Sequence, residues 1–221
     1  QRYANKDNRL VILKNNKNLK ICKTLNKGLE IAKGKYVVRM DADDWSYPNR
    51  IKKQITYMKA HPDVVISGGA MEVCDNNLKI QAARNYPTED VVLRRAIMRY
   101  SPFSHPTVIF DTKTAKKSGG YCTLFSEDIE FYYKMGQFGK FGNLQDLLIK
   151  YRGDVGSSMT NTKLRITELN TIKHRLHAAW KFKYKFSLMD GVYNFLQFLS
   201  IFTIPANWKI YLFNKFRNNR D

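Results

Sequence analysis

Hydrophobic and polar residues alternate along the first two thirds of the chain in a pattern that predicts an α/β fold. Short apolar runs typical of buried strands occur at residues 9–14 and 36–40. Between them, residues 19–32 carry apolar side chains at helical spacing, and Gly34 is a suitable stop for that helix. A strand, a helix and a second strand in this order are typical of a parallel sheet with crossover helices. The pattern therefore predicts a mostly parallel, Rossmann-like sheet flanked by helices.

The same alternation continues downstream. Helical spacing and capping residues predict helices over residues 49–60, 88–98 and 126–135, and a short helix that ends at Gly119 and Gly120. Apolar runs between them predict further strands over residues 64–69, 78–83, 107–110 and 147–152. These elements extend the expected α/β domain to about residue 158.

From about residue 164 the sequence changes in character, because strand-like runs disappear and aromatic, apolar and basic residues are mixed. We therefore predict a domain over residues 1–158 and a helical, basic, amphipathic extension over residues 159–221. The most apolar stretch, residues 186–204, disfavours a transmembrane helix because it contains Asp190, Gly191, Asn194 and Gln197. A helix that lies in a membrane interface and a helix that packs on the domain both remain compatible with the pattern.

The net charge of the chain bears on its binding partner, about which the hydrophobic pattern gives no information. The chain has 38 Lys and Arg against 19 Asp and Glu, a formal charge of +19. Such a charge favours a negatively charged partner, which can be nucleic acid, a phosphorylated small molecule or an anionic membrane surface. No RNP-like, KH-like or helix-turn-helix motif is visible. A basic nucleic-acid-binding module is therefore the alternative interpretation, and we expect no nucleic-acid partner.

Cysteine usage indicates a reducing compartment. The three cysteines are odd in number, scattered and without CxxC spacing, so they suggest neither a disulfide framework nor a zinc site. The first residues are polar and basic and do not form a secretory signal. We expect a cytoplasmic protein.

Three carboxylates, Asp41, Asp43 and Asp44, directly follow the strand predicted at residues 36–40. Ligands of open α/β sheets bind beyond the carboxyl ends of the strands. Mg²⁺ and Mn²⁺ take oxygen ligands, commonly one or two carboxylates together with substrate phosphates. In an extended chain, the side chains of Asp41 and Asp43 would point to the same side and could bind one metal ion that carries a diphosphate. Taken alone, this motif is also typical of a solvated turn or a helix cap.

Two other metal chemistries fit less well. A calcium loop would need a third ligand and a glycine where Trp45 and Ser46 stand. A phosphohydrolase with an aspartyl nucleophile remains an alternative, for which Glu127 and Asp128 would supply the second acidic pair.

Several ordered blocks together resemble a known family. The segment "LNKGLEIAKGKYVVRMDADDWSYPNRIKKQITYMKAHPDVVISGG" is similar, nearly residue for residue, to the central part of bacterial family-2 glycosyltransferases of the GT-A fold. The later blocks "SPFSHPTVIF", "GGYCTLFSEDIEFYYKM" and "LLIKYR" resemble the same family in the same order. The resemblance covers about residues 9–158 and is more specific than the acidic motif alone.

The resemblance implies a nucleotide-sugar donor, with a UDP-sugar expected, whose diphosphate is bridged to Mn²⁺ or Mg²⁺ by Asp41 and Asp43. Asp43 is the favoured direct ligand, and Asp44 supports the site. In the same family an acidic pair supplies the catalytic base, which corresponds here to Asp128 with Glu127 as its neighbour. Inverting sugar transfer needs such a carboxylate to take the proton of the acceptor hydroxyl.

The alternative for the acidic pair is a capping role at a helix N-terminus. At that position we expect Asp128 to keep a low pKa. His105 matches a family block and is expected on the acceptor side, although a structural histidine before a proline fits equally well. For Arg39 and Lys33, a position facing the diphosphate is one interpretation, and a solvated face is the favoured one.

The activity implied by the resemblance is metal-dependent, inverting transfer to a glycan or lipid-linked acceptor in cell-envelope polysaccharide synthesis. The basic extension would hold the protein at the inner face of the cell membrane, as a peripheral protein on an anionic surface. The family's nucleoside-binding strands would precede Gln1. We therefore expect this chain to carry the metal and acceptor side of the site.

Overall fold

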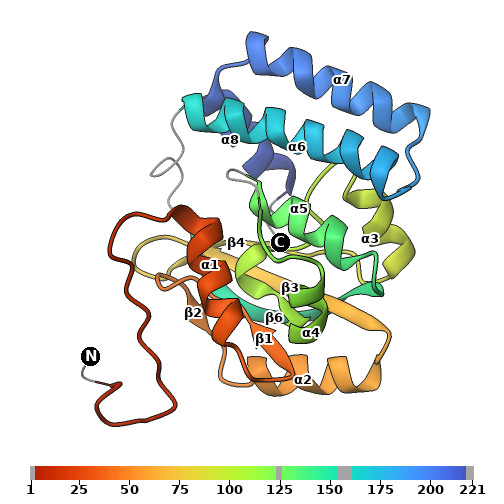
Figure 1. Cartoon of the computed structure of the whole chain (residues 1–221). Helices are drawn as coiled ribbons and strands as arrows, with labels where there is room; N and C mark the ends of the chain where they lie inside the picture. Colours follow the sequence, from red (N-terminus) through yellow and green to blue (C-terminus); the bar gives the residue numbers. More distant parts are fainter. Residues whose placement is uncertain (1–2, 123–125, 154–160, 218–221) are drawn as a thin grey trace.

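The computed structural model describes residues 3–122, 126–153 and 161–217, which form a sheet covered by helices (Figure 1). The sheet has six strands, β1 (Tyr36–Val38), β2 (Trp45–Ser46), β3 (Val64–Cys74), β4 (Ile80–Arg84), β5 (Ile109–Asp111) and β6 (Lys140–Arg152). The helices are α1 (Lys20–Ile31), α2 (Arg50–Ala60), α3 (Asp90–Ala96), α4 (Thr112–Lys117), α5 (Glu127–Met135), α6 (Asn161–Lys181), α7 (Leu188–Thr203) and α8 (Ala206–Arg217). A short 3₁₀ helix, η1, covers His105–Thr107.

The sheet is mixed, with strand order β1-β5-β3-β6-β2 and β4 on the side of β3. Only β3 and β6 pair in parallel among the described strands, whereas the β1–β5, β3–β5, β3–β4 and β2–β6 pairs are antiparallel. The expected mostly parallel pairing is therefore wrong for the described strands. One reason is local: β4 follows β3 through a short turn, and a short connection can join only antiparallel neighbours.

The strand expected at residues 9–14 is absent. Leu10 to Leu13 form no strand in the structure, and their side chains are 40–66% exposed. No described strand pairs with this segment. An apolar run that has no partner for its backbone N–H and C=O groups does not form a strand, whatever its β-propensity.

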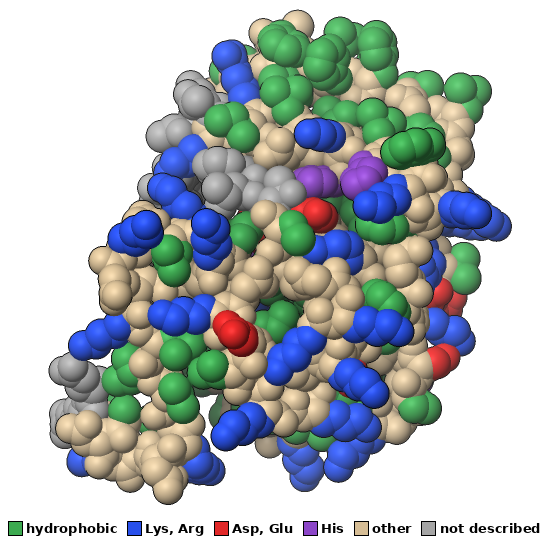
Figure 2. All heavy atoms as spheres, in the orientation of Figure 1, with side chains coloured by type: hydrophobic (Ala, Val, Ile, Leu, Met, Phe, Trp, Pro, Cys, Tyr) green, Lys and Arg blue, Asp and Glu red, His purple; other side chains and the backbone are tan. Residues whose placement is uncertain are grey.

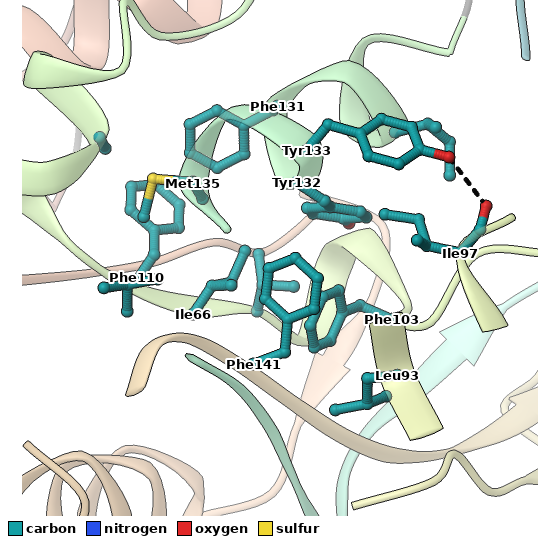
Figure 3. Packing of buried hydrophobic residues seen from close by; sticks show 14 of the residues in the cluster. Ile66, Leu93, Ile97, Phe103, Phe110, Phe131, Tyr132, Tyr133, Met135 and Phe141 are labelled. Carbon is teal, nitrogen blue, oxygen red and sulfur yellow. Dashed lines mark hydrogen bonds between the residues drawn. The ribbon is translucent and has the colours of Figure 1, made fainter. Parts of the chain in front are cut away.

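The main core lies between α5 and the sheet (Figure 3). Helix α5 buries five side chains there: Ile129, Phe131, Tyr132, Tyr133 and Met135. The aromatic rings meet edge to face, with centroids 4.9 Å apart for Phe103 and Tyr132 and 5.1 Å apart for Phe110 and Phe131. The Tyr133 hydroxyl donates a hydrogen bond of 3.0 Å to the carbonyl of Ile97. This packing fixes the position of α5, whose first residues are the predicted acidic pair.

The helical extension is confirmed and consists of α6, α7 and α8, which lie together at the top of Figure 1. Ala178 and Tyr184 belong to the same buried cluster as α5, so the extension shares the main core. The domain boundary expected after residue 158 lies outside the described residues. None of the helices in the described part of the chain is long and apolar enough to cross a membrane. Basic side chains are spread over the visible face rather than gathered in one block (Figure 2).

Candidate functional site

The predicted metal motif lies in a turn at the end of β1. The backbone N–H of Arg39 bonds to the carbonyl of Val108 at 2.9 Å, which holds the strand end against the neighbouring segment. The chain then turns, and the N–H of Asp44 reaches the carbonyl of Asp41 at 3.4 Å. The extended geometry expected for Asp41 and Asp43 is therefore wrong. The carboxylates are instead arranged around a turn at the carboxyl end of the strand.

Arg39 holds the first of these carboxylates. Its guanidinium nitrogens lie 2.6 Å from both carboxylate oxygens of Asp41, a two-point ion pair. The Arg39 side chain is only 10% exposed, so the expected solvated position is wrong. The available sequence signal was the position of this arginine two residues before Asp41, at the strand end where ligands bind.

Asp43 and Asp44 have different surroundings. Asp43 is exposed, as a residue that meets an incoming ligand should be. Asp44 is partly buried, and one of its oxygens accepts a 3.0 Å hydrogen bond from the backbone N–H of Arg152. Its other oxygen is buried and has no partner among the described residues. Burial raises the pKa of Asp44 to about 6.

Arg50 lies behind the turn and was missed by the sequence analysis. Its side chain is 1% exposed and donates to the carbonyls of Arg39 at 2.6 Å and Pro106 at 2.8 Å. It also donates to the Gln54 side chain at 3.0 Å, one helical turn along α2. Burial lowers the pKa of Arg50 to about 10, so the group stays charged at neutral pH. Arg50 therefore ties the end of β1 to the segment that carries η1.

The acidic pair stands at the start of α5, after Ser126 in the left-handed conformation with φ 79°. Burial, together with the charge of Glu127, raises the pKa of Asp128 to about 6. Burial also raises the pKa of Glu127. The low pKa expected for Asp128 is thus wrong, because removal from water outweighs the favourable helix terminus.

The two groups of carboxylates share one electrostatic environment. The charge of Arg39 lowers the pKa of both Glu127 and Asp128, and the charge of Asp41 raises that of Glu127. Coulomb interactions of this kind act over short distances in a partly buried setting. The end of β1 and the start of α5 are therefore close enough for their charges to interact.

His105 belongs to the same region. One of its ring nitrogens lies 3.1 Å from the hydroxyl of Tyr121. Burial lowers the pKa of His105 well below its usual value, and the charge of Arg39 lowers it further. The ring is therefore neutral at physiological pH. The neighbouring Tyr132 ring meets it edge to face, and the buried Tyr132 hydroxyl has no hydrogen-bond partner in the described part of the chain.

A cleft of about 580 Å³ opens beside this site. It runs between the start of α1 and the end of β1 and is lined by Asn15, Lys17, Asn18, Leu19, Lys20, Ile21, Thr24, Leu25, Arg39, Met40 and Asp41. Lysine, arginine and amide side chains in one cleft suit a phosphate-bearing ligand.

The residues at the turn fit a hard divalent cation. Carboxylate oxygens are the ligands that Mg²⁺ and Mn²⁺ prefer, and Asp44 keeps a buried oxygen without a partner among the described residues. No group of three or more acidic, histidine or cysteine side chains converges as a metal site within the described ranges. A donor set of one or two carboxylates matches the usual Mg²⁺ arrangement, in which substrate phosphates complete the shell.

Carboxylates at a strand end, a basic cleft beside them and a partly buried acidic pair are typical of an enzyme that handles a phosphorylated substrate. The chain belongs to glycosyl transferase family 2, whose model matches residues 1–127.

Individual relatives agree with this assignment. The chain is 36% identical over 156 residues to the amylovoran biosynthesis glycosyltransferase AmsE of Erwinia amylovora, a match that covers 70% of this chain and 58% of that protein. It is 26% identical over 204 residues to the UDP-Gal:alpha-D-GlcNAc-diphosphoundecaprenol beta-1,3-galactosyltransferase of Escherichia coli, over 90% of this chain and 72% of that one. The chain thus spans less than two thirds of the length of the first of these relatives.

A solved structure supports the fold. The mannosyltransferase PcManGT from Pyrobaculum calidifontis, solved in complex with GDP-Man and Mn²⁺, aligns with a TM-score of 0.54 at 14% identity. The alignment covers 95% of this chain and 57% of that structure. The GT-A-like α/β class expected from the sequence is confirmed.

Proposed function

We propose that this chain is the metal- and acceptor-binding part of an inverting glycosyltransferase. It would move a sugar from a nucleotide-diphosphate donor to a glycan or lipid-linked acceptor in cell-envelope polysaccharide synthesis. The observation that carries the proposal is the position of Arg39, which pairs with Asp41 and acts through its charge on Glu127 and Asp128. Residues 1–158 are the proposed glycosyltransferase domain, and residues 159–221 its extension.

On the donor side, Asp43 and Asp41 would hold Mn²⁺ or Mg²⁺ together with the diphosphate, and Asp44 would support the turn. The bound metal ion would neutralise part of the charge on the leaving diphosphate. Lys17, Lys20 and Arg39 line the adjacent cleft and supply further positive charge. The relative from Escherichia coli is named for a UDP-sugar donor, which supports the choice of a UDP-sugar here.

On the acceptor side, Asp128 is the proposed catalytic base, with Glu127 beside it. A pKa of about 6 leaves its carboxylate ionised at neutral pH and basic enough to accept a proton. Asp128 would take the proton of the acceptor hydroxyl as that oxygen attacks the anomeric carbon. Attack opposite the departing diphosphate inverts the configuration. The neutral His105 would border the acceptor without changing the charge of the site.

The acceptor and the charge together favour a place at a membrane. The relative from Escherichia coli is named for a diphosphoundecaprenol-linked acceptor, and this chain carries a net charge of +19. Both support a peripheral protein at the cytoplasmic face of the cell membrane.

The direct test is incubation of the full-length protein with a panel of nucleotide sugars, Mn²⁺ or Mg²⁺ and an acceptor, with release of nucleoside diphosphate as the readout. We expect release from one donor and loss of turnover in EDTA. Full activity in EDTA, or release of inorganic phosphate instead of nucleoside diphosphate, would contradict the proposal.

The matching variant is Asp43→Asn. We expect it to abolish metal-dependent turnover, because it removes the most exposed carboxylate of the turn. Its melting temperature should stay close to that of the wild type, since an exposed side chain contributes little to stability. A variant that keeps its turnover would show that Asp43 is not a ligand.

A further inference from the structure

Helix α7 turns its polar face toward the protein and its apolar face toward solvent. Its polar residues Asp190, Asn194 and Gln197 are spaced four and three residues apart, which places them on one face of the helix. Asp190 and Asn194 are 7% and 4% exposed. A surface helix of a globular protein normally buries its apolar face and exposes its polar one. Here the polar face is turned toward the protein.

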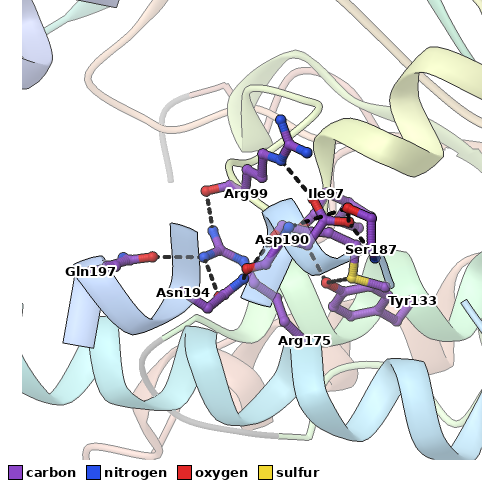
Figure 4. Close-up of polar contacts among 9 residues, drawn as sticks. Ile97, Arg99, Tyr133, Arg175, Ser187, Asp190, Asn194 and Gln197 are labelled. Atoms are coloured by element: carbon purple, nitrogen blue, oxygen red, sulfur yellow. Dashed lines mark hydrogen bonds and ion pairs between the residues drawn. The ribbon is translucent and has the colours of Figure 1, made fainter. Parts of the chain in front are cut away.

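The buried polar face is held by two arginines (Figure 4). Arg175 of α6 donates to the side chains of Asn194 at 3.0 Å and Gln197 at 2.7 Å. Arg99 donates to Asp190 at 2.6 Å, and its carbonyl accepts from Arg175 at 2.5 Å. Asn194 also donates to the carbonyl of Met98 at 3.0 Å. These bonds fix how α7 is rotated about its axis, and they leave the apolar face outside.

The outward face is strongly apolar. Its most exposed side chains, at 58–85%, are Leu188, Met189, Phe195, Leu196 and Phe202 of α7 and Trp208 of α8. Hydrophobic side chains gather at the top of the molecule in Figure 2, where Figure 1 places α7. A contiguous exposed apolar patch of this kind marks a surface that binds another protein or a membrane.

The charge of the residues around the patch distinguishes between a second copy of the chain and a lipid surface as its partner. Residues 161–217 hold ten Lys and Arg against two acidic residues, Glu168 and Asp190. Both acids are engaged in ion pairs, with Lys209 and Arg99 respectively. The exposed Lys181, Lys183 and Lys185 lead directly into α7. A second copy of the chain would bring equal positive charge to the same place, whereas an anionic lipid surface is attracted to it.

We propose that the outward face of α7, continued by Trp208 of α8, inserts into the interface of an anionic membrane. The buried network around Arg175 presents this face already assembled, so no refolding of the helix is needed. The helix would lie in the plane of the membrane with its apolar side among the acyl chains and its lysines at the headgroups. The inference deepens the proposed function by giving the surface on which a lipid-linked acceptor would be met.

The test is sedimentation of the full chain with vesicles of phosphatidylcholine mixed with phosphatidylglycerol, and with vesicles of phosphatidylcholine alone. We expect binding to the anionic vesicles that weakens as salt is added. Phe195→Glu should lower the partition coefficient by about tenfold or more, because it places a charge among the acyl chains. Phe195→Lys should also weaken binding although it adds positive charge. Val91→Glu is the matched control, since Val91 is also 60% exposed but lies on α3.

Three outcomes would overturn the inference. The first is vesicle binding by both Phe195 variants as strong as that of the wild type. The second is a loss of vesicle binding in Val91→Glu equal to that in Phe195→Glu. The third is a dimer in sedimentation velocity that Phe195→Glu dissociates while vesicle binding is unchanged. The last would assign the face to a second copy. Melting curves should match the wild type, since the substituted side chains are exposed. Sugar transfer to a water-soluble acceptor is measured in parallel, so that failure of the enzymatic proposal and failure of membrane binding are seen separately.

Discussion

Arg39 is the residue on which the candidate site depends most. It is nearly buried, forms a two-point pair with Asp41 and lowers the pKa of both carboxyls of the acidic pair. A positive charge near carboxylates favours their ionised form and here opposes part of the rise in pKa that burial causes at Glu127 and Asp128. Burial lowers the pKa of His105, and the charge of Arg39 adds to that lowering. Arg39 thus influences several titratable groups of the site, although burial has the larger effect on each.

The first prediction at this scale concerns Asp128. In the full-length enzyme, Asp128→Asn should lower the turnover number by about 10²–10⁴, because the general base is removed. Donor affinity should stay near that of the wild type, and Glu127→Gln, the matched neighbour, should have a smaller effect. Steady-state kinetics measures both. If Glu127→Gln loses more turnover than Asp128→Asn, the two roles are exchanged.

The second prediction is the pH dependence of the same group. A base must be ionised to act, so turnover should rise with pH through about 6, the pKa that burial gives Asp128. The contribution of Asp128 to the free energy of unfolding should instead decrease as pH rises. The native carboxyl binds its proton more tightly than the unfolded one, so its stabilising contribution is present below the unfolded pKa and is lost as pH rises through about 6.

Asp128→Asn removes this titration. Thermal melts at acidic and alkaline pH should therefore differ less in the variant than in the wild type. An unchanged difference would show that Asp128 does not titrate in this range.

At the scale of elements, buried arginines join segments that are distant in the sequence. Arg50 links α2 to the carbonyls of Arg39 and Pro106, and Arg175 links α6 to α7 and to the turn after α3. A planar guanidinium can donate to several carbonyl and amide oxygens in fixed directions, which a lysine cannot do. These contacts specify how elements are docked, whereas apolar packing alone tolerates more than one arrangement.

The prediction at this scale is that Arg175→Met destabilises the fold. The change removes the Arg175 donor from the buried Asn194 side chain, the partly buried Gln197 side chain and the carbonyl of Arg99, at a cost of about 2–4 kcal/mol. Lys173→Met on the same helix is the control, because Lys173 is exposed. Urea unfolding measures both. Equal stability of the two variants would show that the network contributes little.

For the whole molecule, net charge and exposed apolar surface oppose each other. A charge of +19 keeps copies apart, while the apolar residues 10–13 and the outer face of α7 favour association. Screening shortens the reach of the charges to about 10 Å at 0.1 M salt. The balance should therefore shift toward association as salt is added.

We accordingly predict that light scattering of the purified protein rises with salt concentration. Val11→Lys should reduce the rise, since Val11 is 66% exposed in a segment that no described strand pairs. Ile51→Lys, at a similarly exposed position on α2, should change it less. Scattering that falls with salt would indicate that charge attraction, rather than apolar contact, drives association.

The sequence by itself determined the local and chemical features. Helical spacing located α1, α2, α5 and the helical extension, and the acidic motifs predicted both carboxylate groups of the candidate site. These features depend on residues close together in the chain. Periodicity, caps and short motifs record such relations directly.

Only the tertiary structure decided how these parts meet. It made most strand pairs antiparallel and left residues 9–14 outside the sheet, because pairing depends on which strands become neighbours. It raised the pKa of Asp128, since desolvation depends on surrounding elements rather than on the helix terminus alone. It also turned Asn194 and Gln197 inward, because Arg175 supplies in three dimensions the partner that makes a buried polar face stable.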